Sequence, residues 1–525
     1  MTGSMNKKSN LNILLAILVI LLPALWAGAI ALFNFCKYGS GLSVPMWNDE
    51  AVYYALIKTW ITPGAHNAFG NSIGYYGFNG GHAILGTGSG WSPAIIFPYA
   101  VFAKMFGLNY HTVWIANIIF MMMGNAIFLL IVKSDLAGKI KLLVTEAFAA
   151  PIILYISTQM SEPLRYALTL ILAACIYKLF DDENRGKIFS YVIVPLYIIC
   201  LVQIYVFFVF VVPIYIFAIL KDKKVWIRIL AALVSTGIVG GGSYALLHLI
   251  SSNYNTYKAE KLFNAIGSGD ITGMIRAAVG MVKEGVADWF NLFRYGANHG
   301  LLTWFTIVIF ALFVIGIVGF LKAETRKDKA LFLSASAGLF IFIGGFVTMY
   351  SPDPNTFFRS ISIVVLFAVF LIMMTDGKLL SRAALLVFAA GVVFVPLNIG
   401  DYTGEERVLS KKKAMEWDSL AGNFEKVLAI DTKASPWDST LTVFTLEPKV
   451  LASVAPGIGI NMMLTEDTIP TESGYLLFTK HEGNLRGDWL EKSFKDIYEK
   501  NKEIIDSDYT LVYEDNDYLI YKKNK

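Results

Sequence analysis

Residues 11–33 read LNILLAILVILLPALWAGAIALF and contain no charged side chain. A helix needs about 20 apolar residues to cross the hydrocarbon of a bilayer, so this stretch predicts a membrane-spanning helix. The stretch is too long for the core of a signal peptide and has no small-residue cleavage pattern, so we expect it to remain as an anchor. Similar runs recur along the chain and predict a polytopic α-helical membrane protein.

The other apolar runs bring the prediction to about eleven crossings. Residues 188–220 are a special case, because one helix of that length would measure about 50 Å and Pro195 and Pro213 interrupt it. We expect two short helices there, with a turn near Gln203. The remaining runs are approximately 112–132, 141–159, 163–180, 226–250, 301–321, 330–350, 358–375 and 382–397.

Composition and charge agree with a lipid environment. Hydrophobic residues make up 56% of the 525 residues and charged residues 16%, against about 25% charged residues in soluble proteins. The net charge of +4 is small, which argues against a nucleic-acid partner. Short basic clusters between the runs predict the cytoplasmic side, so we expect an integral plasma-membrane protein with a cytoplasmic N-terminus. These clusters are 133–141, 178–187, 221–228, 322–329 and 378–382.

The predicted domains are a membrane domain, residues 1–397, and an extracytoplasmic soluble domain, residues 398–525. Two long outer loops belong to the first, at 34–111 and 251–300. Ala94–Phe106 is apolar but too short to span, which predicts a helix lying in the membrane interface. Apolar residues at helical spacing predict amphipathic helices in the second loop as well.

The soluble domain has the sequence pattern of a small α/β or α+β fold. Asp488–Ile504 predicts a helix, and the last two predicted strands flank Glu514–Asp517 as a hairpin. The predicted strands are Lys426–Ile430, Leu441–Leu446, Gly474–Thr479, Thr510–Tyr513 and Tyr518–Lys522.

An acidic motif, WNDEAVYY at residues 47–54, follows the first predicted crossing. Asp49 and Glu50 are adjacent carboxylates among aromatic residues, which suits a general base or a divalent-cation site. The alternative is structural: Asn48 or Asp49 caps a helix that continues to Trp60. The aromatic candidates for binding an acceptor or a sugar are Trp47, Tyr53, Tyr54 and Trp91.

A second acidic position, Glu162, lies in the outer turn between the third and fourth crossings, next to Ser161 and Pro163. These residues also suit a plain helix start. Because Glu162 and Asp49 both lie at outer ends of crossings, we expect them at the same membrane depth. Arg359 begins an apolar crossing from the same side, where it either snorkels as an anchor or binds a phosphate through its planar fork. Arg165 and Lys58 are weaker phosphate-binding candidates of the same kind.

Together these features resemble the GT-C superfamily of membrane glycosyltransferases. The resemblance consists of the Asp49-Glu50 pair with Tyr53 after it, a large first outer loop, Glu162 at the start of the fourth crossing, and a C-terminal extracytoplasmic domain. The segment from Trp91-Ser92-Pro93 to Phe106-Gly107 also resembles that family. This chain has Trp-Ser-Pro where many members carry His and Pro, and Arg359-Ser360 where many carry Arg-Tyr.

The resemblance implies a hexosyl or pentosyl transferase that moves a sugar, with inversion, from a polyprenyl-phosphate lipid to an extracytoplasmic glycan, lipid or protein. Asp49 would be the base, and Glu50 or Glu162 would orient the acceptor or, with Asp49, hold Mg²⁺ or Mn²⁺. Arg359, Arg165 and Lys58 would bind the donor phosphate. Two alternatives remain: a glycolipid transporter or flippase, which would favour charges near the midplane such as Glu146, and a receptor-like glycan-binding protein.

Overall fold

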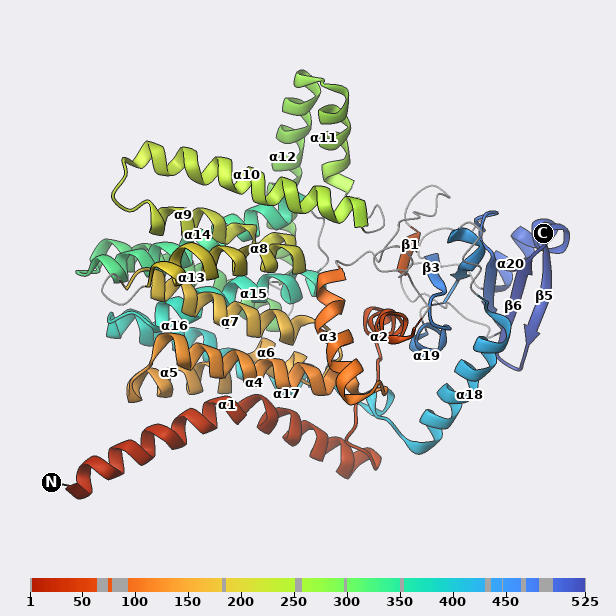
Figure 1. Ribbon diagram of the computed structural model, residues 1–525, viewed down its shortest axis with the longest axis horizontal. Helices are drawn as coiled ribbons and strands as arrows, with labels where there is room; N and C mark the ends of the chain where they lie inside the picture. The colour runs from red at the N-terminus through yellow and green to blue at the C-terminus, as the bar shows by residue number, and fades with distance from the viewer. Residues whose placement is uncertain are drawn as a thin grey trace. The chain divides into compact units, whose positions relative to one another are not determined.

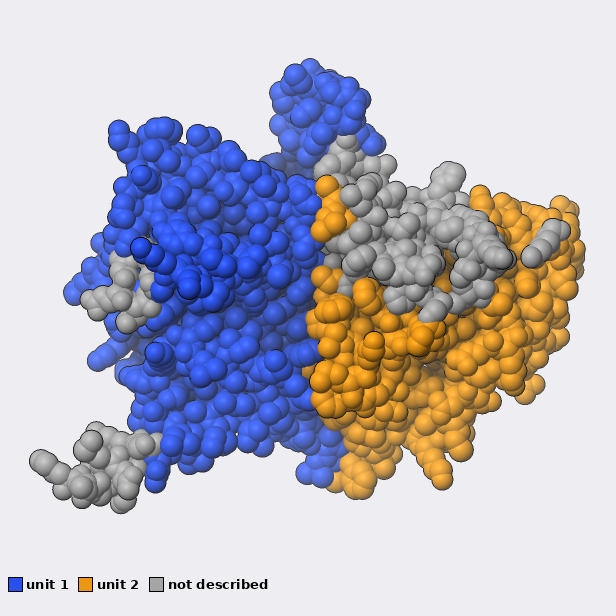
Figure 2. Space-filling model, viewed as in Figure 1, with its two compact units in different colours: residues 1–33, 117–243, 255–404 blue, residues 34–116, 244–254, 405–525 orange. Residues whose placement is uncertain are grey.

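The computed structural model describes residues 2–63, 74–77, 93–181, 186–250, 257–296, 300–349, 354–429, 436–445, 447–463, 469–480 and 494–524. The chain folds into two compact units, which Figure 2 shows in blue and orange. Unit 1 consists of residues 1–33, 117–243 and 255–404, and unit 2 of residues 34–116, 244–254 and 405–525. The first outer loop therefore folds with the C-terminal segment, which the sequence did not predict.

Seven of the described helices are long and apolar enough to cross a membrane. The protein is therefore an integral membrane protein, as predicted. The seven spans are Asn10–Tyr38 within α1 (Thr2–Tyr38), α4 (Thr112–Val132), Val225–Ser243 within α10 (Val225–Ile250), α13 (Gly300–Lys322), α14 (Arg326–Met349), Thr356–Met373 within α15 (Pro354–Met373), and Lys378–Tyr402, which joins α16 (Lys378–Ala389), η3 (Ala390–Phe394) and α17 (Val395–Tyr402).

The other predicted crossings form shorter helices of unit 1. The run at 141–159 is divided between α5 (Leu136–Ala147) and α6 (Ala150–Tyr155), because Pro151 starts a new helix. The run at 163–180 is α7 (Glu162–Leu179), whose Leu170, Leu172, Ala173 and Ala174 are fully buried among neighbouring helices. Figure 1 shows α7 alongside α4, α8 and α15 in this helical layer.

The predicted break in residues 188–220 is confirmed. The first half contains η1 (Phe189–Ile193) and α8 (Val194–Ile204), and the second contains η2 (Val206–Phe210) and α9 (Val211–Ile219). Tyr205 between them is extended, with φ of −153°. The Tyr215 hydroxyl donates to the Ser190 carbonyl at 3.0 Å, so the end of the second half lies beside the start of the first.

The helices expected in the second outer loop are present as α11 (Tyr257–Ser268) and α12 (Ile271–Gly296). Gly269 joins them with φ of +69°, a conformation that glycine adopts without strain, and Asp270 caps α12 through the Gly273 N–H at 2.9 Å. Figure 1 shows this helical hairpin crossing the direction of the bundle helices. One face of α12 exposes apolar side chains at helical spacing: Ile271, Ile275, Val279, Val282, Val286 and Phe290.

Unit 2 is built on a mixed six-stranded sheet of order β1-β3-β2-β4-β6-β5. The strands are β1 (Gly74–Gly77), β2 (Thr440–Val443), β3 (Gly459–Met463), β4 (Tyr475–Thr479), β5 (Tyr509–Glu514) and β6 (Tyr518–Lys523). The first outer loop supplies β1, which pairs in parallel with β3. The described helices of unit 2 are α2 (Asn48–Ile61), α3 (Pro93–Phe106), α18 (Lys411–Val427), α19 (Pro448–Ser453) and α20 (Phe494–Asp508), with the short helices η4 (Glu405–Arg407) and η5 (Pro436–Ser439).

The predicted C-terminal hairpin is confirmed as β5 and β6, and the interfacial segment is helical as α3. The strand predicted at 426–430 is wrong, because α18 continues to Val427. That helix is capped at Ser410, whose hydroxyl accepts from Lys413 N–H at 3.1 Å, and it buries Trp417, Leu420 and Phe424 at helical spacing. The helical period therefore outweighs the short β-like run at its end.

Candidate active site

Glu50 lies in the third position of α2 and is completely buried in unit 2. Its Oε2 accepts hydrogen bonds from the backbone N–H groups of Met46 at 2.7 Å and Trp47 at 2.9 Å. Arg407 Nη1 lies 2.7 Å from Oε1 and 2.9 Å from Oε2. Both carboxylate oxygens are thus engaged, so Glu50 anchors the start of α2 to the segment that follows the last span.

Arg407 is also held by its own surroundings. Its side chain is 1% exposed, and its guanidinium carbon lies 4.5 Å from the centre of the Trp47 ring. The Arg407 carbonyl accepts from Val44 N–H at 2.8 Å, and Ser43 pairs with Val408 as an isolated antiparallel bridge. Sequence reasoning missed Arg407, because its partner Glu50 is 357 positions away and no periodic pattern connects them.

Asp49 differs from Glu50 although the two are adjacent. Successive helical residues point about 100° apart, and the Asp49 side chain remains partly exposed while Glu50 is buried. The predicted helix is confirmed as α2, which ends at Ile61, but its N-cap residue is Trp47 and not Asn48 or Asp49. Asp49 is therefore an acidic residue in the first turn, where the helix dipole favours a carboxylate.

The remaining candidates on α2 pack inside unit 2. Tyr53 is 1% exposed and Tyr54 is 7% exposed. Tyr54 stacks on Tyr110 with ring centres 5.3 Å apart. Lys58 Nζ donates to the Ala452 carbonyl at 3.3 Å, and burial lowers the pKa of Lys58 to about 8. These contacts join α2 to other parts of unit 2.

Trp91, the fourth aromatic candidate, lies outside the described residues. The other three, Trp47, Tyr53 and Tyr54, share α2 and its N-cap. The aromatic candidates within the described residues therefore belong to a single helix start in unit 2.

Glu162, Arg165 and Arg359 come together in unit 1. Glu162 begins α7 and is completely buried. Its Oε1 lies 3.4 Å from Arg165 Nη1, one turn along the same helix, and 3.4 Å from Arg359 Nε at the start of α15. One carboxylate between two guanidiniums leaves a net charge of +1, which favours a further anion.

The two arginines differ in access. The Arg165 side chain is 6% exposed, and its guanidinium carbon lies 4.5 Å from the centre of the Tyr205 ring. The Arg359 side chain is 26% exposed. Arg359 is therefore the cation that a ligand from outside reaches first, with Arg165 behind it. Glu162 Oε2 is buried and has no hydrogen-bond partner among the described residues.

Aromatic residues that the sequence analysis did not select surround this cluster. Tyr155 packs on Tyr402 with ring centres 5.2 Å apart and on Tyr166 at 6.2 Å. The Tyr166 hydroxyl is 2.8 Å from Ser362 Oγ, which donates to the Arg359 carbonyl at 2.8 Å. Tyrosines are common at the ends of membrane-spanning helices, where they form an aromatic belt. The sequence alone therefore does not distinguish these tyrosines from such a belt, and only their contacts in the structure do.

The donor set does not fit a divalent cation. Both oxygens of Glu50 are occupied by Arg407 and two N–H groups, and Glu162 lies between two guanidiniums, which would repel a metal ion. Within the described ranges, no three His, Cys, Asp or Glu side chains form a group suited to a metal. Glu50 and Glu162 are therefore unsuited to the Mg²⁺ or Mn²⁺ site that the resemblance implies.

Glu146 was the one candidate charge away from the outer helix ends. It is buried in unit 1, and its Oε2 accepts from Asn125 Nδ2 at 2.7 Å. The same amide nitrogen donates to the Val19 carbonyl at 2.8 Å. Glu146 thus joins α5 to α4 and α1, a structural contact between helices.

Comparisons with known proteins bear on the fold alone. The solved structures similar to this chain include ArnT from Cupriavidus metallidurans, once bound to undecaprenyl phosphate and once in the apo state. Each matches with 10% identity and a TM-score of 0.47, over 97% of this chain and 97% of that chain. The Archaeoglobus fulgidus oligosaccharyltransferase in its apo form matches with 12% identity and a TM-score of 0.46, over 85% of this chain and 64% of that chain.

The chain matches no protein-family model and no curated protein sequence. ArnT and the oligosaccharyltransferase are both GT-C superfamily structures. At TM-scores below 0.5 the likeness carries no argument about chemistry, which has to be derived from this chain's own side chains.

Proposed function

We propose that this protein is a membrane glycosyltransferase that moves a hexosyl or pentosyl group, with inversion, from a polyprenyl-phosphate donor to an extracytoplasmic acceptor. The observation that carries this proposal is the cluster of Glu162, Arg165 and Arg359, where two guanidiniums at helix starts share one buried carboxylate. Its net positive charge and the partial exposure of Arg359 suit the phosphate of a lipid whose tail stays in the bilayer. The N-terminus is then cytoplasmic and residues 398–525 are extracytoplasmic.

The arginine pair would act on the leaving group. When the bond between the anomeric carbon and the phosphate oxygen breaks, the phosphate leaves as a stable anion and needs no general acid. Positive charge fixed beside a low-dielectric region stabilises that anion strongly. Glu162 would position the two guanidiniums, because its Oε1 lies 3.4 Å from a nitrogen of each.

Asp49 would act on the acceptor. The acceptor hydroxyl oxygen forms the new bond to the anomeric carbon, and its proton passes to the Asp49 carboxylate as the phosphate leaves. One displacement inverts the anomeric centre. Asp49 suits this role better than Glu50, because Asp49 is partly exposed whereas Glu50 is completely buried.

Transfer by purified protein tests the proposal. The full chain, reconstituted in lipid nanodiscs, is given a radiolabelled polyprenyl-phosphate sugar and a set of candidate acceptors. We expect labelled sugar to leave the lipid, and polyprenyl phosphate to copurify with the protein. Release of no sugar to any acceptor, together with movement of the intact lipid between vesicle leaflets, would replace the enzyme with the flippase alternative. Binding of a glycan without binding of the lipid would favour the receptor alternative.

A further inference from the structure

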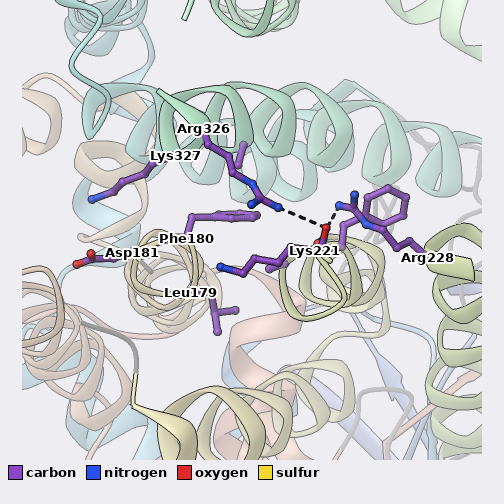
Figure 3. A pocket seen from close by; sticks show the side chains of 10 residues that line it. Leu179, Phe180, Asp181, Lys221, Arg228, Arg326 and Lys327 are labelled. Atoms are coloured by element: carbon purple, nitrogen blue, oxygen red, sulfur yellow. Dashed lines mark hydrogen bonds between the residues drawn. The ribbon is translucent and has the colours of Figure 1, made fainter. Parts of the chain in front are cut away.

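A cavity of about 340 Å³ lies in unit 1 where α7 and α9 end and α10 and α14 begin. Four cationic side chains line it together with a single carboxylate and an apolar wall that includes Phe217. Figure 3 shows Arg326 and Arg228 converging from opposite sides on the region of Lys221. The charged lining residues are Lys221, Arg228, Arg326, Lys327 and Asp181.

This cavity is separate from the cluster of Glu162, Arg165 and Arg359. Glu162 is the first residue of α7 and Leu179, which lines the cavity, is the last. At 1.5 Å per residue their main chains are about 26 Å apart. The cavity therefore belongs to the opposite end of the helix layer, the end that the basic clusters predict to be cytoplasmic.

Both arginines are held in place by the main chain. Arg228 Nη2 donates to the Phe217 carbonyl at 2.9 Å, and its guanidinium carbon lies 4.4 Å from the centre of the Phe217 ring. Arg326 Nη2 donates to the Lys221 carbonyl at 3.3 Å. A guanidinium has five N–H donors, so these bonds orient each fork and leave it with further donors. Arg228 Nε is buried without a hydrogen-bond partner among the described residues.

Arg228 and Arg326 lie at helix N-termini, where a positive charge destabilises the folded protein unless an anion neutralises it. Arg228 lies in the first turn of α10, which contains no acidic residue, and Arg326 is the first residue of α14. A positive charge at a helix N-terminus is destabilised by the helix dipole, whereas an anion there is stabilised. Both arginines would therefore gain from an anion between them.

Asp181 and Asp328 each interact with a group that does not line the cavity. Asp181, the one carboxylate of the lining, lies 3.8 Å from Lys178 Nζ. Asp328, in the first turn of α14, accepts through Oδ1 from the Asp376 N–H at 3.2 Å. The lining itself holds four cations and one carboxylate, which is an excess of positive charge.

We propose that this cavity binds the phosphate headgroup of an anionic membrane lipid. The forks of Arg228 and Arg326 bind the phosphate oxygens, the starts of α10 and α14 add their partial positive charge, and the Phe217 side of the cavity contacts the apolar part of the lipid. This site is independent of the proposed sugar transfer. A general basic surface would not require two arginines fixed by main-chain carbonyls around one partly open cavity.

The test is a lipid titration of the purified full-length protein. Melting temperature is followed while phosphatidylglycerol, phosphatidylcholine or inorganic phosphate is added to the delipidated protein in neutral detergent. We expect a saturable rise with phosphatidylglycerol and none with phosphatidylcholine. Inorganic phosphate should act only at concentrations at least tenfold higher. A response to inorganic phosphate at equal concentration would overturn the lipid assignment.

Variants locate the site. Arg228→Gln combined with Arg326→Gln should weaken phosphatidylglycerol binding at least tenfold, and Arg326→Gln alone, at an exposed position, serves if the double variant does not fold. The matched control is Arg382→Gln, an exposed arginine of another basic cluster outside the cavity. Equal loss of binding in the control, or unchanged binding in both Arg326 variants, would overturn the proposal.

Discussion

Two buried carboxylates, one in each unit, show how similar charges serve different purposes. Glu50 in unit 2 receives two backbone N–H groups and Arg407 Nη1, at 2.7–2.9 Å, which engages both oxygens. Glu162 in unit 1 has two arginines, each at 3.4 Å from the same oxygen, while Oε2 has no hydrogen-bond partner among the described residues. The Glu50–Arg407 pair is neutral and both carboxylate oxygens are bonded, whereas the Glu162 cluster has a net positive charge and one carboxylate oxygen without a hydrogen bond among the described residues.

The difference bears on function. The carboxylate of a neutral, buried ion pair has no oxygen left for a ligand, and breaking the pair leaves an uncompensated buried charge. A cluster with excess positive charge and a partly exposed arginine gains from binding an anion. Substitutions in the Glu50 contacts should therefore change stability, whereas substitutions in the Glu162 cluster and at Asp49 should change catalysis.

The largest effect is expected at Asp49, the partly exposed neighbour of Glu50. Asp49→Asn removes the proton acceptor and nearly preserves the shape, so the transfer rate should fall by about 10²- to 10⁴-fold. Because Trp47 rather than Asp49 is the N-cap, the melting temperature should stay nearly unchanged. Transfer from a polyprenyl-phosphate sugar measures the effect, with Glu405→Gln as an exposed acidic control in unit 2. A wild-type rate in Asp49→Asn would exclude Asp49 from the mechanism.

The next effect is on the stability of unit 2. Arg407→Leu leaves the Glu50 carboxylate buried without its counter-charge and should cost about 3–5 kcal/mol in the free energy of unfolding. Adding Glu50→Leu to it should recover part of that loss, because an apolar pair has no charge to desolvate but the Met46 and Trp47 N–H groups lose their acceptor. Denaturant unfolding measures both. Lys412→Ala, which breaks an exposed ion pair with Glu416, should cost less than about 1 kcal/mol. Equal costs at Arg407 and Lys412 would contradict the structural role.

The sequence was sufficient to predict elements that arise from local patterns. The long apolar runs, the interruption of residues 188–220 and the closing hairpin of β5 and β6 all depend on residues close in sequence. It was not sufficient for contacts between distant segments. The pairing of β1 with β3 and the bond between Glu50 and Arg407 join parts of the chain hundreds of residues apart. Neither contact leaves a periodic signal.

The same limit applies to the candidate site. Glu162, Arg165 and Arg359 were each identified from their place at the outer ends of crossings, and their mutual contacts came only with the fold. The burial of Tyr53 and Tyr54 and the partial burial of Lys58 could not be predicted, because α2 is enclosed within unit 2 and is not a surface helix. A motif that combines polar and aromatic residues is compatible with either environment.

A smaller effect is expected at Arg359. Arg359→Lys keeps the charge but loses the planar fork, which should raise KM for the lipid donor about tenfold. Since the side chain is 26% exposed, the melting temperature should change little. Donor titrations of Arg359→Lys and Arg359→Ala measure this, with Lys378→Gln, an exposed cation elsewhere in unit 1, as the control. Full donor use by both Arg359 variants would make the residue a membrane anchor.

The smallest effect is expected at Lys58 of α2. A substitution there tests whether this residue affects the stability of unit 2 or binds the donor phosphate. Burial lowers the pKa of Lys58 to about 8 in the folded protein, against about 10.4 when unfolded. Between these pH values the unfolded state binds more protons at Lys58 than the folded state does. Lys58 therefore makes the free energy of unfolding rise with pH across this window, and below pH 8 it destabilises the folded protein by the full amount. Lys58→Met removes the charge but also the bond to the Ala452 carbonyl. The net gain at pH 7 should be about 1 kcal/mol and should shrink as the pH approaches 10. Thermal unfolding at several pH values measures this gain, and donor KM should stay at the wild-type value. A tenfold rise in KM without a change in stability would instead return Lys58 to the phosphate-binding residues.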